Sequence, residues 1–175
     1  MTHIAGIAMP SQRPQAAVEV ESTPAPAATP DIAQLAVLVV DDNEQNLELL
    51  QAYLEDLGCE IRAARDGVEA LSSIEAREPD LILLDVMMPR MSGFQACMKI
   101  KANPRTRDIP VVMVTALNEV GDVERAVESG ADDFLTKPVN KLELLTRVRS
   151  LLRIRQMKRQ LDRTLEEVRR LTSGS

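Results

Sequence analysis

At residues 80–93 the sequence reads DLILLDVMMPRMSG, in which a short apolar run ends at an aspartate. Residues 81–84 are all apolar, which is typical of a strand buried on both faces of a parallel sheet. Ligands of open parallel α/β sheets bind beyond the carboxyl ends of the strands. Asp85 therefore stands where a functional side chain is expected.

Four other short runs have strand character, and stretches with apolar residues at helical spacing separate them. Together with residues 81–84, the expected strands are residues 36–40, 60–64, 111–114 and 133–135. After the first strand, Leu47, Leu50 and Leu54 recur at helical spacing, and Gly58 stands where a helix C-cap glycine belongs. Strands that alternate with helices predict right-handed crossovers and a doubly wound, five-stranded parallel α/β fold.

Polar residues with functional chemistry follow four of these strands. Asp41 and Asp42 follow the first strand, and Asp85 follows the third. Thr115 follows the fourth strand, and Lys137 follows the fifth. Each of them alone has an ordinary explanation, such as a helix cap or a turn. Their convergence from four strands on one edge of the sheet predicts a functional site.

The residue types at this edge favour phosphoryl transfer assisted by Mg²⁺. Three adjacent carboxylates repel one another, and a hard divalent cation removes that cost. A carboxylate also acts as a covalent nucleophile towards phosphorus. The transfer then needs charge neutralisation and positioning, which Mg²⁺, Lys137 and the Thr115 hydroxyl would supply. The pattern contains no separate general base, so we expect a slow regulatory reaction and not an enzyme with high turnover.

Four stretches of the chain resemble the receiver domains of bacterial two-component response regulators: residues 37–42, 80–93, 111–116 and 130–138. The resemblance extends over residues 35–153. It implies a flavodoxin-like sheet with strand order 2-1-3-4-5 and a cytoplasmic response regulator. It also implies that a histidine kinase or phosphotransfer protein donates the phosphoryl group and that a downstream protein reads the signal.

The resemblance also implies which residues accept the phosphoryl group and bind the metal. Asp85 would be the phosphoacceptor and a ligand of Mg²⁺. Asp42 would bind the ion directly, and Asp41 would bind it directly or through water. The backbone carbonyl of Met87 would complete the share of the coordination that the protein provides.

Three further residues would convert phosphorylation into a conformational change, again by the resemblance. Lys137, followed by Pro138 across a cis peptide bond, would hold a phosphoryl oxygen. Thr115 would move towards the phosphoryl group, and Phe134 would follow by turning inward. Phe134 stands where the family often has Tyr, so signalling through a tyrosine hydroxyl is excluded and signalling through packing is not. Leu117 and Met87 flank the site and are expected to tune hydrolysis through water access.

The residues disfavour several other functions. An aspartyl-phosphate phosphatase or mutase would need a second carboxylate two residues after Asp85, where Met87 stands. One Tyr and no Trp offer little aromatic surface for stacking on a flavin, which disfavours a flavin carrier. No GxxxxGK[ST] motif marks a nucleotide site. Cys59 and Cys97 lie far apart without a CxxC pattern, which indicates buried thiols in a reducing compartment. No apolar run approaches the roughly 20 residues that span a membrane.

The chain divides into three expected parts: a disordered, Ala/Pro-rich leader (1–34), a receiver domain (35–153) and a helical extension (154–175). One helix is expected over residues 141–171. In the extension, apolar residues fit a heptad seam that predicts a short coiled coil and a homodimer, although Thr164 interrupts it and Leu165 lies beside it. The seam comprises Ile154, Met157, Leu161, Val168 and Leu171.

The output of the protein is left open between two hypotheses. The first is a stand-alone receiver that signals through protein contacts. The second is a receiver fragment of a larger regulator, in which the last helix leads to a cyclic-dinucleotide enzyme or a kinase. Nucleic-acid binding is disfavoured by the net charge of −6. Residues 153–175 hold seven basic and three acidic side chains, a local charge of +4, but carry no recognition motif.

Overall fold

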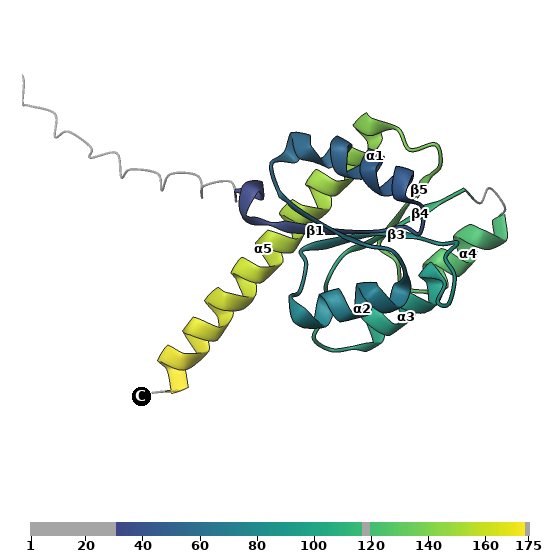
Figure 1. Cartoon of the computed structure of the whole chain (residues 1–175). Coiled ribbons are helices and arrows are strands. Elements are labelled where there is room, and N and C mark those ends of the chain that lie inside the picture. Colours follow the sequence, from purple (N-terminus) through teal and green to yellow (C-terminus); the bar gives the residue numbers. More distant parts are fainter. Residues whose placement is uncertain (1–30, 117–119, 174–175) are drawn as a thin grey trace, which may run out of the picture.

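The computed structural model of the chain describes residues 31–116 and 120–173. They form one parallel sheet in the order β2-β1-β3-β4-β5, between two layers of helices (Figure 1). The strands are β1 (Ala36–Val40), β2 (Glu60–Ala64), β3 (Leu81–Asp85), β4 (Val111–Thr115) and β5 (Asp133–Thr136). The helices are α1 (Glu44–Leu54), α2 (Gly67–Ala76), α3 (Gly93–Ala102), α4 (Val120–Glu128) and α5 (Lys141–Ser173), with 3₁₀ turns η1 (Ile32–Gln34) and η2 (Glu55–Leu57). The predicted doubly wound, flavodoxin-like fold and its strand order are confirmed.

The central strands are apolar throughout because both of their faces are buried. Successive side chains of a strand point to opposite faces, so β1 contributes Val37 and Val39 to one core and Leu38 and Val40 to the other. Helices α1 and α5 cover the first face, and α2, α3 and α4 cover the second (Figure 1). The sheet is therefore a rigid platform whose carboxyl edge remains open for a site.

Polar side chains fix the points at which the helices begin. Asn43 accepts a hydrogen bond from the Asn46 backbone N–H at the start of α1, 3.2 Å away. Ser92 and Gln95 form a reciprocal capping box at the start of α3. Gly58, in the left-handed conformation at φ 68°, ends η2, in agreement with its predicted role as a C-cap. Each helix that follows β1 or β3 therefore starts directly beyond the carboxyl edge.

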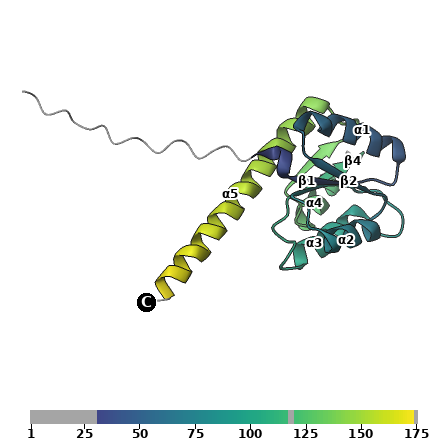
Figure 2. The same cartoon turned by 60° about the vertical axis from the view of Figure 1, so that its left-hand side comes forward.

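Helix α5 is continuous from residue 141 to residue 173, as predicted. Leu144, Val148 and Leu152 are buried against the sheet. Its last part, after the contact of Arg159 with Asp80, projects from the body of the domain into solvent (Figures 1 and 2). The apolar residues of the predicted seam are exposed along residues 154–171. None of the helices in residues 31–116 and 120–173 is both long and apolar enough to cross a membrane. Residues 1–30 of the predicted leader lie outside the described residues.

The middle of α5 is fixed to the amino edge of the sheet by charged contacts. Arg155 is buried and donates to the backbone carbonyl of Asp108 at 3.0 Å, and Lys158 pairs with the Asp108 carboxylate at 2.5 Å. Arg159 pairs with Asp80, which directly precedes β3. The second oxygen of Asp80 accepts the backbone N–H of Ala36, at the start of β1, at 2.8 Å. One carboxylate therefore joins β1, β3 and α5.

Replacing Asp80 tests this junction. Asp80→Ala leaves the buried Ala36 N–H without its acceptor, so the free energy of unfolding should fall by about 2 kcal/mol. Arg159→Ala should cost less than about 1 kcal/mol, because this arginine is partly exposed. Urea denaturation of both variants measures the difference. Equal effects of the two substitutions would contradict a role for Asp80 in holding β1.

Candidate functional site

Three aspartates form an acidic cluster at the carboxyl edge of the sheet. Carboxylate oxygens of Asp41, Asp42 and Asp85 lie within 4.8 Å of one another. Asp85 ends β3, and Asp41 and Asp42 follow the neighbouring strand β1, so the parallel register brings them together. Asp41 and Asp85 are 1% and 4% exposed, whereas Asp42 is exposed. The predicted convergence of these three carboxylates is therefore present.

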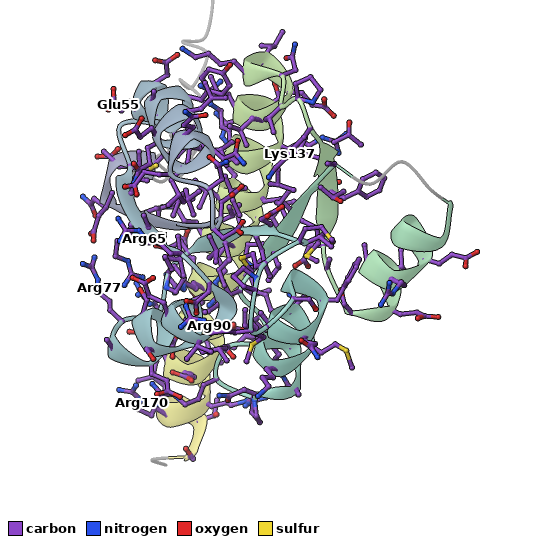
Figure 3. The ribbon with its side chains drawn as sticks, turned by 45° about the vertical axis from the view of Figure 1, so that its right-hand side comes forward. Glu55, Arg65, Arg77, Arg90, Lys137 and Arg170 are labelled. Atoms are coloured by element: carbon purple, nitrogen blue, oxygen red, sulfur yellow. The ribbon has the colours of Figure 1, made fainter. Side chains whose placement is uncertain are left out.

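Lys137 directly follows β5, the outer strand of the sheet, and brings a positive charge into this cluster. Its ammonium lies 2.8 Å from Asp41 Oδ2 and 3.1 Å from Asp85 Oδ1. The backbone N–H of Lys137, a residue labelled in Figure 3, donates to the Thr115 carbonyl at 2.7 Å, which aligns the residue beyond β5. The peptide bond from Lys137 to Pro138 is cis. The side chain thus reaches two buried carboxylates that come from different strands.

Asp41 is oriented by two asparagines. Its Oδ1 accepts the backbone N–H of Asn43 at 2.9 Å and the side-chain amide of Asn46 at 3.2 Å. Its Oδ2 faces Lys137. Sequence reasoning did not single out Asn43 or Asn46. The available signal was the position of Asn43 directly before a helical pattern, where an N-cap belongs.

The electrostatics of the cluster favour an additional positive charge. The pKa of Asp85 is raised to about 6, first by burial and then by the charge of Asp41, while Lys137 opposes both effects. Burial lowers the pKa of Lys137, but its hydrogen bonds and charge interactions with Asp85 and Asp41 outweigh that effect and raise it overall. The ionised carboxylate of Asp85 is therefore destabilised where it stands. A bound cation would relieve this destabilisation.

The other predicted site residues lie around the cluster. Thr115 ends β4 and is 7% exposed, and Phe134, on β5, is 38% exposed. The Met87 side chain, in the loop after β3, is 64% exposed. Leu117 lies outside the described residues. The cluster therefore has Thr115 at its β4 side and the loop of residues 86–92 at its β3 side.

Gly93 permits this loop to return tightly against the phosphoacceptor position. Its N–H donates to the Val86 carbonyl at 2.9 Å. A Cβ atom at this position would lie 2.1 Å from the backbone oxygen of Asp85. No side chain fits at that distance, so only glycine allows α3 to begin there. The close approach fixes both ends of the loop that carries Met87.

The fold and the cluster agree with the comparisons with known proteins. The family model of the response regulator receiver domain matches residues 37–149. The chain belongs to this family, as the sequence predicted. It is 52% identical over 119 residues to the response regulator PleD of Caulobacter vibrioides, covering 68% of this chain and 26% of that protein. It is 42% identical over 117 residues to the Synechocystis DNA-binding dual master transcriptional regulator RpaA, covering 67% of this chain and 48% of RpaA.

Solved structures show the same similarity. The signal receiver domain of a signal transduction histidine kinase from Syntrophus aciditrophicus has a TM-score of 0.65 at 40% identity, over 67% of this chain and 89% of that one. The chemotaxis protein CheY4 of Vibrio cholerae has a TM-score of 0.64 at 30% identity, over 67% and 98% of the two chains. The chain spans about half or less of the length of PleD and RpaA. These two relatives therefore contain segments beyond the matched region.

The raised pKa of Asp85 predicts a stabilising substitution. Because the pKa is about 6 in the folded chain against an ordinary 3.8, ionisation of Asp85 costs stability. This loss of stability is absent at pH values below the ordinary pKa of 3.8 and reaches its full size above pH 6. Asp85→Asn should therefore raise the free energy of unfolding of the metal-free protein by about 1–3 kcal/mol at pH 7.5. The gain should shrink as the pH falls towards 4.

Urea denaturation at several pH values in the presence of a chelator measures this difference. Asp162→Asn, on the exposed part of α5, controls for the loss of one negative charge. A gain that does not depend on pH, or one that the control shares, would contradict the assignment to Asp85.

Proposed function

We propose that this chain is the phosphoacceptor of a two-component phosphorelay and that Asp85 carries the phosphoryl group. The contact of the Lys137 ammonium with both Asp41 and Asp85 is the observation on which the proposal rests. In this contact, a carboxylate that can act as a nucleophile lies beside a cation that can bind phosphoryl oxygens. Membership of the receiver family supports a histidine kinase or phosphotransfer protein as the donor. We expect the reaction to take place in the cytoplasm.

The donor set of the cluster fits Mg²⁺. Asp41, Asp42 and Asp85 supply hard carboxylate oxygens from one small volume, and the backbone carbonyl of Met87 would add a fourth oxygen. Mg²⁺ bound there would neutralise charge on the phosphoryl oxygens during the transfer. The elevated pKa of Asp85 supports the same conclusion, since the cluster is unfavourable without added positive charge.

The transfer itself requires little from the chain beyond positioning. An oxygen of Asp85 forms a bond to phosphorus as the bond from phosphorus to the donor imidazole nitrogen breaks. The imidazole keeps the electron pair and takes a proton from water. Lys137 then binds a phosphoryl oxygen in place of the Asp85 oxygen that it now contacts. The Thr115 hydroxyl donates to another phosphoryl oxygen, and Phe134 turns inward behind it.

Dephosphorylation is expected to be slow. Water attacks phosphorus, inorganic phosphate leaves, and Asp85 returns to a carboxylate. Met87 stands two residues after Asp85, where a carboxylate would be needed to take the proton from that water. We therefore interpret the chain as a switch and not as an enzyme. Met87 and Leu117 would tune the lifetime of the phosphorylated state.

The phosphoacceptor assignment has a direct chemical test. The full chain is incubated with Mg²⁺ and acetyl phosphate, and the phosphoryl adduct is measured by intact mass spectrometry. Wild type and Asp162→Asn should form the adduct, whereas Asp85→Asn should not. A chelator should abolish the reaction of wild type. An adduct that persists in Asp85→Asn, or wild type that stays unmodified with Mg²⁺ present, would contradict the proposal.

We further propose that α5 transmits the signal. Its predicted seam is exposed along the part of the helix that projects beyond the sheet, and this supports pairing of two copies through a short coiled coil. The alternative is that the helix links the receiver to an output domain such as a cyclic-dinucleotide enzyme or a kinase. PleD, which is much longer than the matched region, is compatible with this alternative.

Light scattering coupled to size-exclusion chromatography distinguishes the two outputs. Beryllofluoride, which stands in for the phosphoryl group on Asp85, is added with Mg²⁺. A dimer that forms with wild type but not with Asp85→Asn or Leu161→Glu would support phosphorylation-driven pairing through α5. An unchanged mass, with beryllofluoride bound, would favour the linker or a partner protein.

A further inference from the structure

A contact between α2 and the loop after β3 lies outside the machinery described above. Arg90, which is labelled in Figure 3, lies in the loop of residues 86–92 and pairs with Asp66 at the N-terminus of α2. Arg90 has φ 67°, and it is the one residue other than glycine with positive φ among those the structure describes. This conformation is strained for an L-residue, so the surrounding contacts must hold it. The ion pair with Asp66 is one of those contacts.

Asp66 is suited to hold the loop as well as to cap its helix. It is 4% exposed, and its Oδ1 accepts the backbone N–H groups of Val68 and Glu69 at 2.8 and 2.9 Å. A serine or an asparagine would cap α2 equally well. The carboxylate has a second oxygen, Oδ2, and this oxygen faces Arg90. Because residue 66 is an aspartate, it makes a charged contact with the loop in addition to capping α2.

A second contact joins the same two elements. A Cβ atom at Gly67 would lie 2.9 Å from Cγ and Sδ of Met91, so glycine at this position leaves room for the Met91 side chain against α2. Met88 and Met91 pack against the core cluster that contains residues of α2 and α3. The loop is therefore held by α2 at residues 90 and 91 and by Gly93 at its end.

We propose that the Asp66–Arg90 pair is a positioning contact that places the Met87 carbonyl for Mg²⁺. The inference rests on the proposed function, because it assigns a purpose to the loop that borders Asp85. Met87 lies between Asp85 and the residues that α2 holds, and its exposed side chain does little to fix its backbone. The pair acts on the metal through the loop and touches neither the metal nor the phosphoryl group.

The expected effect is on affinity and not on stability. Arg90 is mostly exposed, so losing the pair should change the unfolding midpoint little. Groups that orient a metal ligand, by contrast, typically change metal affinity at least tenfold when they are removed. We therefore expect Arg90→Gln and Asp66→Asn each to weaken Mg²⁺ binding about tenfold. Asp66→Asn retains the oxygen that caps α2, which separates the two roles of this residue.

A double-mutant cycle on the full chain tests this inference, with Mg²⁺ affinity measured by calorimetry. The double variant should bind Mg²⁺ no more weakly than either single variant, and Arg90→Lys should recover part of the affinity. Backbone amides of residues 86–92 should exchange hydrogen faster in Arg90→Gln. Arg105→Gln, which removes an exposed arginine paired with Glu78 at 3.3 Å, is the matched control.

The outcomes separate the inference from the function on which it rests. Wild-type affinity in both single variants, additive losses in the double variant, or an equal loss in Arg105→Gln would overturn the positioning contact alone. If wild type does not bind Mg²⁺, and chelation leaves the reaction of Asp85 with acetyl phosphate unchanged, the proposed metal site fails and the inference fails with it.

Discussion

Burial of two negative charges beside each other is the constraint on which this structure depends. Asp41 and Asp85 lie at the ends of adjacent strands and are almost completely buried, and a single ammonium, from Lys137, contacts both. At an effective dielectric constant of 20, two unit charges 4 Å apart interact by about 4 kcal/mol. That energy is a large fraction of the 5–15 kcal/mol that stabilises a typical domain. The cluster is thus a local cost that the rest of the fold offsets.

The packing of the sheet supplies the stability that offsets this cost. This packing does not depend on the charge state of the cluster. Strands β1, β3 and β4 are apolar on both faces, and the two cores that they separate contain no member of the cluster. The carboxylates are confined to the last positions of the strands and the loops beyond. Addition of a proton, a metal ion or a phosphoryl group therefore changes the energy of the carboxyl edge while the cores stay packed. A switch requires this separation between a rigid platform and a site whose charge can change.

The sequence was sufficient for the fold because the strand pattern is strong. The expected strands at residues 36–40 and 60–64 coincide with β1 and β2. β3 extends one residue further than the apolar run, since Asp85 still pairs with Val114 in the ladder. A search for apolar residues ends one residue before the functional side chain, although the strand continues through Asp85. The approach of the cluster residues was predictable for the same reason, because parallel strands bring their carboxyl ends to one edge.

Side-chain pairs between distant segments could not be predicted in this way. Arg90 and Asp66 are 24 residues apart, and neither belongs to a run with a recognisable period. Their contact exists because α2 and the loop after β3 are neighbours on one face of the sheet, a consequence of strand order and not of local pattern. The amide of Asn46 reaches Asp41 only because α1 starts directly beyond β1. Residues that orient the site thus become visible only with the tertiary structure.

Helix α5 connects the two edges of the sheet. It begins at Lys141, four residues after the ammonium that joins Asp41 to Asp85, and lies against the sheet as far as Leu152. At the opposite edge, Arg159 contacts Asp80, which begins the segment that ends at Asp85. The segment from Lys137 to Arg159 therefore contacts both ends of β3. If α5 transmits the signal, as proposed above, a displacement that begins at Lys137 enters a helix without a break, whose middle is held at the amino edge by Arg155 and Arg159.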